Sequence, residues 1–280
     1  LKPLRVLVEG MGNSRAISHI ELVASDSEQA VVIRHVKAFS EKEEQDLLVL
    51  SKNEKVRVFL QGTSDSSAQE IGSNKSDLEY SLNTSTLTGN DDKAKVAKCV
   101  NLAFHPQEFT QVNSAVNQDL VSLALEQLQL KASDRVLDLF CGLGNFTLPI
   151  ALNCSEVVGV EGVNSMVAKA SENADRNHIS NANFYTADLQ ADFRTKLWAK
   201  QSFDKILIDP PRSGALVVAN YLHHFNAQRI VYISCNPATL ARDAGVLSTH
   251  GYRLDASGVI DMFPNTAHVE SIAVFVRQTQ

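Results

Sequence analysis

The feature that most constrains the fold is a repeated alternation of short apolar segments with helix-length segments after residue 106. Five segments rich in β-branched residues recur at this spacing, and they span residues 135–140, 156–161, 183–188, 203–209 and 229–235. Strands that alternate with helices form right-handed βαβ units and therefore a parallel sheet. Two further strand-like segments, 252–260 and 269–277, follow without a long helix between them, so we expect an antiparallel pair at one edge. The sequence thus predicts a doubly wound α/β sheet of seven strands, with its ligand crevice at their carboxyl ends.

Residues before this region have the pattern of a smaller domain. Their apolar periodicity predicts a helix at 42–50 and strands at 19–24, 30–36 and 56–60. We therefore expect a small α/β domain over residues 1–105 and a larger domain over 106–280 that begins with a helix at 112–130. Between residues 61 and 95 Ser, Thr, Asn, Gly and Asp dominate, and this composition predicts loops or a partly disordered insertion.

Net charge and cysteine content limit the binding partners and the cellular location that we expect for this chain. With 26 Lys and Arg against 32 Asp and Glu, the net charge of −6 by itself disfavours a nucleic-acid partner. The four cysteines show no close pairing, so we expect no disulfide framework and a reducing, cytoplasmic location. No apolar run reaches the ~18 residues of a membrane span. The chain begins at Leu1 without an initiator Met, so we expect a fragment or a processed product.

The first predicted strand of the larger domain ends in a glycine-rich turn. Gly142 and Gly144 lie in the run Asp138-Leu-Phe-Cys-Gly-Leu-Gly-Asn145, where a strand-to-helix turn lets a ligand approach the backbone. Thr147 stands where the third glycine of a dinucleotide-binding motif is expected, which argues against a pyrophosphate ligand. Taken alone, the turn is equally well explained as a structural connection.

Acidic residues end the predicted strands that follow the turn. Glu161 lies about 20 residues further on, where a carboxylate can accept hydrogen bonds from both hydroxyls of a ribose. Asp188 and Asp209 end the next two strands. Each of these residues alone could be a helix N-cap. As a set they look like the S-adenosylmethionine site of methyltransferases, with Glu161 at the ribose, Asp188 near the adenine, and Gly142 and Asn145 beside the amino-acid end.

Two residues are candidates for covalent and acid–base chemistry. Cys235 ends the fifth predicted strand and precedes a helix, a position at the crevice where the pKa of a thiol can be lowered. The cysteines at 99, 141 and 154 are interpreted as ordinary packing residues. Glu270 lies among apolar residues at the last strand, where burial can raise a carboxylate pKa toward that of a useful base. A capping or salt-bridged glutamate is the alternative interpretation.

Five motifs in order make the chain similar to a known family. They are Phe109-x-Gln111-Val112-Asn113, Asp138-Leu-Phe-Cys-Gly-Leu-Gly, Asp209-Pro-Pro-Arg212, Ser234-Cys235-Asn236-Pro237 and His268-Val-Glu270. The set resembles the RNA uracil-5-methyltransferase family, and within it the 23S rRNA (uracil-5-)-methyltransferase type. The likeness extends from about residue 19 to the end of the chain.

The resemblance implies a fold, a reaction and site residues. The fold is a Rossmann-type, class I S-adenosylmethionine-dependent methyltransferase sheet preceded by a small α/β domain, and the reaction is methylation of C5 of a uridine in 23S rRNA. Cys235 is implied as the nucleophile that attacks C6 and Glu270 as the base that removes the C5 proton. Phe109 and Arg212 are weaker candidates for contacts with the flipped-out base or its phosphate. The residues expected at the S-adenosylmethionine site are Gln111, Phe140, Gly142, Asn145, Glu161, Asp188 and Asp209.

Two alternatives stay open. A tRNA uracil-5-methyltransferase is one, although the extra domain before residue 105 argues against it. The other is a catalytically inactive fragment that binds RNA or cofactor, against which the presence of Cys235 and Glu270 argues. RNA is the expected partner; no membrane and no protein partner are implied. Members of the 23S rRNA type also carry an N-terminal RNA-binding β-barrel and a cysteine-ligated iron–sulfur cluster, which we expect only in the full-length protein, since no C-x₂-C pattern occurs here. We therefore expect no metal site in this chain.

Overall fold

The computed structural model describes residues 2–12, 14–62, 67–73, 77–88, 91–266 and 268–278, with the side chains of all but 85–96. These residues form two compact units. The first comprises Leu1–Tyr80 and Ala103–Thr110, and the second comprises Ser81–Leu102 and Gln111–Gln280. The sequence-based boundary near residue 105 differs, because it assigns residues 81–102 to the first part of the chain. No helix in the described part of the chain is both long and apolar enough to cross a membrane.

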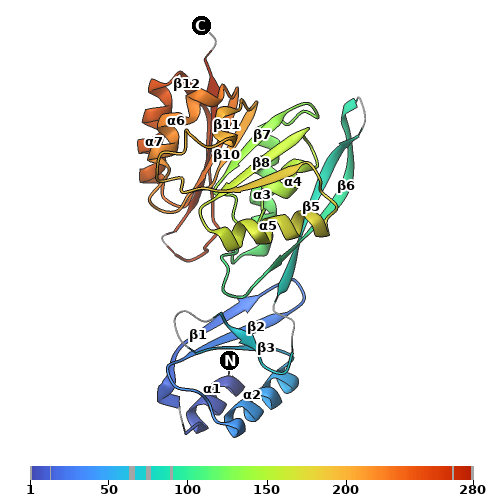
Figure 1. Ribbon diagram of the computed structural model, residues 1–280, viewed down its shortest axis with the longest axis vertical. Helices are drawn as coiled ribbons and strands as arrows, with labels where there is room; N and C mark the ends of the chain where they lie inside the picture. The colour runs from blue at the N-terminus through green and yellow to red at the C-terminus, as the bar shows by residue number, and fades with distance from the viewer. Residues whose placement is uncertain are drawn as a thin grey trace. The chain divides into compact units, whose positions relative to one another are not determined.

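The first unit is a four-stranded sheet with two helices (Figure 1). Its elements are α1 (Lys2–Gly10), β1 (Ile17–Ala24), β2 (Gln29–His35), α2 (Glu41–Glu54), β3 (Arg57–Gln61) and β4 (Gln69–Glu70). Within the sheet order β1-β2-β3-β4, β2 and β3 run parallel and the other neighbours antiparallel. Leu4 of α1, Leu47 of α2 and Ile33 of β2 belong to one buried cluster, so helices and sheet share a core.

The predicted helix at 42–50 is confirmed and is longer at both ends. It begins at Ser40, whose hydroxyl oxygen accepts from the Glu43 N–H at 3.3 Å while the Glu43 carboxylate accepts from the Ser40 N–H at 2.9 Å. This reciprocal capping box satisfies two backbone donors at the helix start. The predicted strands at 19–24, 30–36 and 56–60 correspond to β1, β2 and β3 and are also confirmed.

A hairpin occupies much of the stretch that was predicted as loops. β5 (Leu78–Thr88) pairs with β6 (Asp91–Phe104), so the prediction over 61–95 is wrong for the residues in these strands. Leu78, Tyr80 and Leu82 alternate with polar residues and are buried, which is the period of a strand with one covered face. Ser and Thr hide this pattern in the composition but are compatible with a strand. Residues 63–66, 74–76 and 89–90 of that stretch lie outside the described residues.

Two side-chain amides fasten this hairpin inside the second unit. The Gln118 amide accepts from the N–H of Asn83 and donates to its carbonyl, both at 2.7 Å. The Asn177 amide does the same with the backbone of Asn101, at 2.8 and 2.7 Å. Each amide thus replaces a neighbouring strand and satisfies backbone groups that a two-stranded ribbon leaves unpaired.

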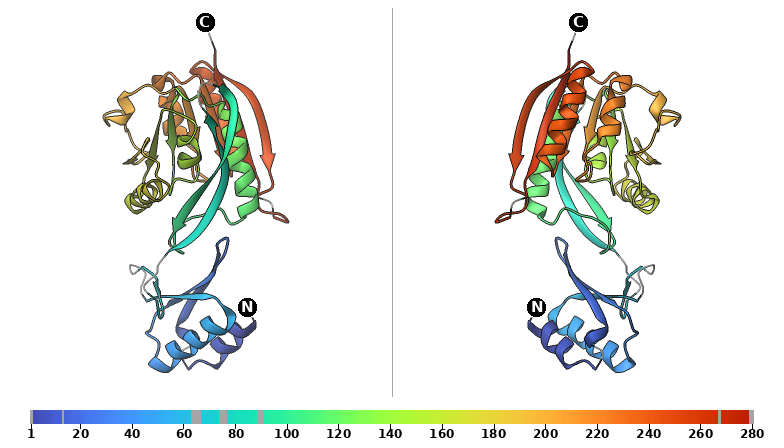
Figure 2. Two further views of the ribbon diagram at one scale, coloured as in Figure 1. Left: turned by 90° about the vertical axis from the view of Figure 1, so that its right-hand side faces the viewer. Right: turned by 90° about the vertical axis from the view of Figure 1, so that its left-hand side faces the viewer.

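The second unit is built on a seven-stranded sheet in the order β12-β13-β11-β10-β7-β8-β9 (Figures 1 and 2). The strands are β7 (Arg135–Leu139), β8 (Glu156–Glu161), β9 (Ala182–Thr186), β10 (Lys205–Ile208), β11 (Arg229–Ser234), β12 (Tyr252–Ile260) and β13 (Glu270–Arg277). The five strands from β7 to β11 run parallel, and β13 is antiparallel to both β11 and β12. The predicted sheet of seven strands with an antiparallel edge is therefore confirmed.

Helices cover both faces of this sheet. They are α3 (Ser114–Leu128), α4 (Thr147–Ala151), α5 (Asn164–Arg176), α6 (Leu216–Tyr221) and α7 (Pro237–Thr249). From β7 the strands β8 and β9 are added on one side of the sheet, whereas β10 and β11 are added on the other side of β7. Because the crossover connections are right-handed, α4 and α5 lie on one face and α6 and α7 on the other (Figure 1). The core beneath α6 and α7 contains Tyr232 of β11, Phe275 of β13 and Trp198 of the connection before β10, all almost fully buried.

The register of the parallel strands places the candidate site residues that follow them at one edge of the sheet. Leu139 is paired with both Val160 and Ile208, and Ile208 with Tyr232, so the parallel strands end close to one level. The carboxyl ends of adjacent parallel strands with reversed chain order form the ligand crevice of such sheets.

Candidate active site

The glycine-rich turn that follows β7 has left-handed backbone conformations at three alternate residues. Phe140, Gly142 and Gly144 have φ values of 64°, 55° and 100°, in the left-handed region. The N–H groups of Phe140 and Cys141 both donate to the Val160 carbonyl, at 2.9 and 3.1 Å, which ties the turn to β8. A left-handed aromatic residue is strained and persists only where its surroundings hold it. Such backbone geometry at the end of a strand opens space for a ligand beside the turn.

Glu161, the last residue of β8, is held by backbone donors. Its carboxylate accepts from the N–H groups of Gly142 at 3.2 Å, Gly162 at 2.7 Å and Val163 at 3.1 Å. These bonds orient the carboxylate against the glycine-rich turn. A carboxylate has about four acceptor positions, so capacity is left for a hydroxyl of a ligand.

Two buried amides support the turn and were missed by sequence reasoning. Asn117 of α3 and Asn145 exchange two amide hydrogen bonds, each of 3.0 Å. Asn173 of α5, which is fully buried, donates to the Leu143 carbonyl at 3.2 Å. A polar residue on the covered face of an amphipathic helix was the available signal, because such a group needs a partner.

Asp138 on β7 is a further residue that the site-residue predictions omit. It is fully buried, and burial raises its pKa to about 8, helped by the charges of Asp209 and Glu161. The Thr147 hydroxyl donates to its Oδ2 at 2.5 Å. Its Oδ1 has no hydrogen-bond partner among the described residues. Thr147, which replaces a third glycine in the motif, thus anchors a carboxylate beneath the turn.

The remaining cofactor candidates are placed as follows. Asp188 lies beyond the end of β9, is exposed, and accepts from the Gln190 N–H at 2.8 Å. Gln111 is half-buried and is the first residue of the segment Gln111–Gln280 of the second unit. Asp209 follows β10 directly, and its N–H donates to the Leu139 carbonyl at 3.3 Å. Phe109 belongs to the first unit, and its side chain is 74% exposed.

Cys235 lies directly after β11 and before α7. The Asn236 side chain caps this helix by accepting from the Ala238 N–H at 3.1 Å. The start of a helix can lower the pKa of a thiol, but the pKa of Cys235 is raised. Burial raises the pKa of Cys235, the carboxylates Glu270 and Asp209 raise it further, and only Arg212 among the neighbouring charges lowers it. Burial and two nearby negative charges together outweigh Arg212 and the favourable end of a helix.

Two carboxylates share this environment. Glu270, the first residue of β13, is 5% exposed, and burial raises its pKa while Arg212 lowers it. Burial together with the charge of Glu270 raises the pKa of Asp209 to about 7. A desolvated carboxylate is a stronger base than one in water, so Asp209 and Glu270 are both better proton acceptors than an exposed carboxylate.

Arg212 brings a positive charge to this cluster. Its Nη2 lies 3.2 Å from Nδ1 of His268, and its backbone carbonyl accepts from the Asn236 amide at 3.2 Å. The first bond connects the loop after β10 with the segment before β13, and the second connects it with the start of α7. The structure therefore gathers Asp209, Arg212, Cys235 and Glu270, from segments far apart in sequence, at one end of the sheet.

Comparisons with known proteins identify the family and the fold. The family model for tRNA (Uracil-5-)-methyltransferase matches residues 91–278. The 23S rRNA (uracil(1939)-C(5))-methyltransferase RlmD of Xanthomonas axonopodis pv. citri (strain 306) is 47% identical over 276 residues, which are 98% of this chain and 59% of the relative. That of Acinetobacter baumannii (strain ACICU) is 44% identical over 281 residues, 98% of this chain and 58% of the relative. The chain thus spans about three-fifths of the length of these curated relatives.

Solved structures share the fold. The Pyrococcus abyssi tRNA (uracil-54, C5)-methyltransferase in complex with S-adenosyl-L-homocysteine matches with a TM-score of 0.70 at 23% identity, over 98% of this chain and 66% of that one. M. jannaschii TYW2 in complex with AdoMet matches with a TM-score of 0.54 at 14% identity, over 92% of this chain and 100% of that one. Both confirm the predicted Rossmann-type methyltransferase architecture. The sequence match over most of the second unit goes further than shared architecture: this chain belongs to the tRNA (uracil-5-)-methyltransferase family.

Proposed function

We propose that this chain carries the catalytic machinery of an S-adenosylmethionine-dependent RNA uracil-C5 methyltransferase whose target is a uridine of 23S rRNA. The observation that carries the proposal is the meeting of a half-buried thiol, Cys235, with a buried carboxylate, Glu270, at the end of the sheet that also holds the glycine-rich turn. A nucleophile and a base at a cofactor crevice are what methylation of an unreactive carbon requires.

The residues present fit S-adenosylmethionine, which when bound supplies an electrophilic methyl group. Asp138 Oδ1 is a buried acceptor with no partner among the described residues, and it suits an ammonium group. Glu161 is oriented for ribose hydroxyls, and an added Cβ at Gly142 would meet only Met166 Cε, at 3.7 Å, so backbone and ligand can approach there. The further residues that we propose to line this site are Gln111, Phe140, Asn145, Asp188 and Asp209.

The chemistry explains why a thiol is needed. C5 of uracil is too weak a nucleophile to take a methyl group unaided. Attack of the Cys235 thiolate on C6 forms an S–C6 bond and pushes electrons onto C5 and the O4 carbonyl, so that C5 can accept the methyl group. Arg212 is the neighbouring charge that favours the thiolate.

Release of the product needs a base. Once C5 is methylated, Glu270 removes the remaining C5 proton, the C5=C6 double bond re-forms, and the S–C6 bond breaks to return the Cys235 thiolate. Burial strengthens the Glu270 carboxylate as a base for this step. The sequence of steps consumes one methyl group and releases one proton, and the enzyme returns to its starting state.

Substrate contacts extend the proposal. A base can reach both Cys235 and the cofactor only when it leaves its stack, so we propose an unpaired or flipped-out uridine as substrate. Arg212, which is exposed, is proposed to contact a uracil oxygen or a phosphate, and Phe109 is proposed to contact RNA through its exposed ring. The four free thiols support the proposed cytoplasmic location.

Two substrate classes are to be compared. The RlmD relatives are named for 23S rRNA, whereas the Pyrococcus abyssi structure is of an enzyme named for tRNA. The chain is 44–47% identical to the two RlmD relatives over nearly its whole length but 23% identical to the Pyrococcus abyssi enzyme. The higher identity favours the rRNA target.

A transfer experiment tests the proposal. The chain is incubated with S-adenosylmethionine and either 23S rRNA transcripts or tRNA transcripts, and digested nucleosides are assayed for 5-methyluridine by mass spectrometry. We expect 5-methyluridine from 23S rRNA alone; product from tRNA alone would replace the target by the alternative. Binding of S-adenosylhomocysteine, measured by calorimetry, is the separate readout for the cofactor site. A chain that binds this ligand and RNA but forms no 5-methyluridine would contradict the proposed reaction.

A further inference from the structure

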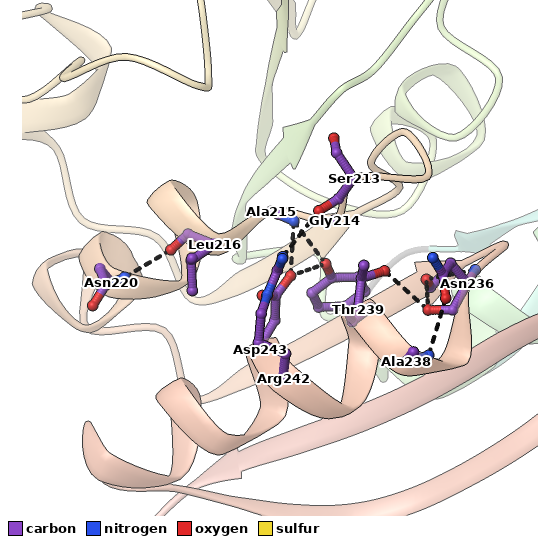
Figure 3. A network of polar contacts seen from close by, with 12 residues as sticks. Ser213, Gly214, Ala215, Leu216, Asn220, Asn236, Ala238, Thr239, Arg242 and Asp243 are labelled. Carbon is purple, nitrogen blue, oxygen red and sulfur yellow. Dashed lines mark hydrogen bonds and ion pairs between the residues drawn. The ribbon is translucent and has the colours of Figure 1, made fainter.

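A second polar cluster lies beside the reactive one and is not used in the chemistry above. It joins the loop 209–215, which carries Arg212, to α7, which begins next to Cys235 (Figure 3). Its centre is Asp243, a fully buried carboxylate on α7. The cluster therefore connects two segments of the reactive site through groups that do not themselves face a substrate.

Asp243 accepts hydrogen bonds from donors in three different elements. Its Oδ2 accepts from the Ala215 N–H at 2.7 Å and from the Tyr232 hydroxyl at 2.7 Å, and its Oδ1 accepts from Arg242 Nε at 2.8 Å. Arg242 Nη2 in turn donates to the Ser213 carbonyl at 3.0 Å. A buried carboxylate with this many charge-assisted bonds is costly to loosen, so it is a rigid anchor for the loop.

The loop is shaped to fit this anchor closely. Gly214 has φ +76°, and a Cβ built there would lie 2.7 Å from Arg242 Nη2, 2.8 Å from Asp243 Oδ2 and 2.9 Å from Thr239 Cβ. Only glycine lets the loop backbone lie against α7 in this conformation. At the other end of the same contact, Arg212 and Asn236 are joined by the amide hydrogen bond already described.

We propose that Asp243 is a positioning residue which, with Tyr232 and Arg242, holds the 209–215 loop against α7 so that the Arg212 guanidinium stays beside Cys235 and Glu270. The inference rests on the proposed function only in taking Cys235 as the nucleophile. Asp243 acts through Arg212 and touches neither substrate nor cofactor. Removal of the anchor frees the loop and lets the positive charge move away from the thiol.

Because Asp243 is charged, loss of its charge and displacement of Arg212 change the pKa of Cys235 in opposite directions. The groups that act electrostatically on Cys235 are Glu270, Asp209 and Arg212, from three different segments. In Asp243→Asn a negative charge is lost, and by direct electrostatics this makes the thiolate easier to form. Displacement of Arg212 has the opposite effect. A thiol that becomes harder to ionise in this variant therefore reports position rather than charge.

The experiment measures alkylation of Cys235 by iodoacetamide across pH 6–11, about the range in which thiols titrate, by mass spectrometry of its peptide. In Asp243→Asn we expect a higher midpoint pH and a rate at pH 8 that is lower by about threefold to tenfold. Cys99, which is exposed, is the internal control and keeps its rate. The plateau rate at high pH separates altered access to the thiol from altered ionisation.

Two further variants complete the design. Asp134→Asn alters another buried carboxylate of the second unit, which accepts from the Lys131 N–H at 2.9 Å beside the start of β7, and leaves the Cys235 profile unchanged. If Asp243→Asn does not fold, as judged by its thermal transition, Tyr232→Phe carries the test. That variant removes one hydroxyl and is expected to lower the rate at pH 8 by about twofold.

The outcomes separate this inference from the proposed function. A folded Asp243→Asn protein whose Cys235 midpoint is unchanged or lower would overturn the positioning role. Alkylation needs neither RNA nor cofactor, so failure of the wild-type chain to form 5-methyluridine would contradict the reaction while leaving the alkylation result standing. In methyl transfer we expect Asp243→Asn to lower kcat and to leave the KM for S-adenosylmethionine unchanged, whereas a general loss of structure would alter both.

Discussion

The edge of the large sheet where the parallel strands end has two parts, a proposed cofactor half and a proposed reactive half, whose polar residues have different surroundings. In the cofactor half, at the ends of β7, β8 and β9, Glu161 is held by three backbone N–H groups and Asn145 by a reciprocal amide pair with Asn117. In the reactive half, at the ends of β10 and β11 and the start of β13, the pKa values of Glu270 and Cys235 are set mainly by burial and neighbouring charge.

This difference matches two different tasks. Groups that bind a ligand gain from fixed orientation, which hydrogen bonds to the backbone provide. Carboxylates that take protons gain from a higher pKa, and burial raises the pKa of Asp209 and Glu270. The same burial and the two carboxylates raise the pKa of Cys235, so the charge of Arg212 is what favours its thiolate. In the proposed function, one sheet edge therefore supplies both a rigid surface for the cofactor and a reactive cluster shaped by burial and charge.

The largest effect is expected in the reactive half from Cys235→Ala. Loss of the nucleophile removes the only proposed route to an activated C5, so methyl transfer falls by at least about a thousandfold. Binding of S-adenosylhomocysteine, measured by calorimetry, stays at the wild-type value because the cofactor half is intact. Cys99→Ala is the matched control and keeps full transfer. Near-normal 5-methyluridine formation by Cys235→Ala would remove the thiol from the mechanism.

Glu270→Gln affects the same half at a later step. The amide cannot take the C5 proton, so turnover falls by about a hundredfold to ten-thousandfold while the methylated covalent complex accumulates on ordinary RNA. A gel shift that resists denaturation, followed over time, measures this accumulation. Glu156→Gln, at the opposite end of the sheet on β8, is the control and shows no accumulation. Unchanged turnover in Glu270→Gln would assign the proton transfer to another group.

Asp138 sharpens the comparison because it lies in the cofactor half but is desolvated like the reactive residues. Its pKa is raised to about 8 in the folded chain, so the folded state binds a proton that the unfolded state releases at lower pH. The free energy of unfolding should therefore fall as pH rises from about 4 to about 8. Asp138→Asn, which keeps an acceptor for Thr147, removes this contribution and is more stable than the wild type at pH 8 by about 1–3 kcal/mol.

Urea unfolding at pH 5 and pH 8 measures this difference. Asp188→Asn alters an exposed carboxylate in the same half and is the control, with the pH dependence of the wild type. Equal pH dependence in the wild type and Asp138→Asn would mean that Asp138 is ionised in the folded chain.

The smallest effect is expected from the support of the turn. Asn117→Ala removes both hydrogen bonds that the Asn145 side chain exchanges with Asn117. We expect S-adenosylhomocysteine binding to weaken by about fivefold to tenfold, the effect of one or two lost hydrogen bonds. Gln118→Ala, at the next residue on α3, removes the hairpin contact and a hydrogen bond to Ser122, and leaves this affinity unchanged. Equal affinities in both variants would show that the amide pair does not support the cofactor half.

Features with a local signature could be read from the sequence. The seven strands follow from apolar periodicity, and the parallel strands among them end within about two residues of the predicted positions, as propensity-based boundaries usually do. Phe140, Asp209 and Cys235 were predicted at strand ends, and each lies immediately beyond one. The glycine-rich turn was recognisable because its glycines occupy left-handed conformations that few other residues adopt.

Features that depend on distant partners could not be read in this way. The pKa of Cys235 is raised partly by Glu270, 35 positions further along the chain, and sequence position alone suggested the opposite direction. Asp243 resembles an ordinary helix residue until the fold brings Ala215 and Tyr232 to it. The hairpin was hidden because its composition is that of a loop, while its stability depends on side-chain amides from other elements.

The central claim is covalent catalysis by Cys235, and RNA containing 5-fluorouracil tests it most directly. Fluorine at C5 cannot leave as a proton, so after methyl transfer the S–C6 bond cannot break and the protein stays attached to RNA. With S-adenosylmethionine present, we predict a complex that survives denaturation and whose RNA-linked peptide, sequenced by mass spectrometry, carries the modification on Cys235. An adduct on another residue, an adduct that persists in Cys235→Ala, or methylation of ordinary RNA without any adduct on the fluorinated one would contradict the account.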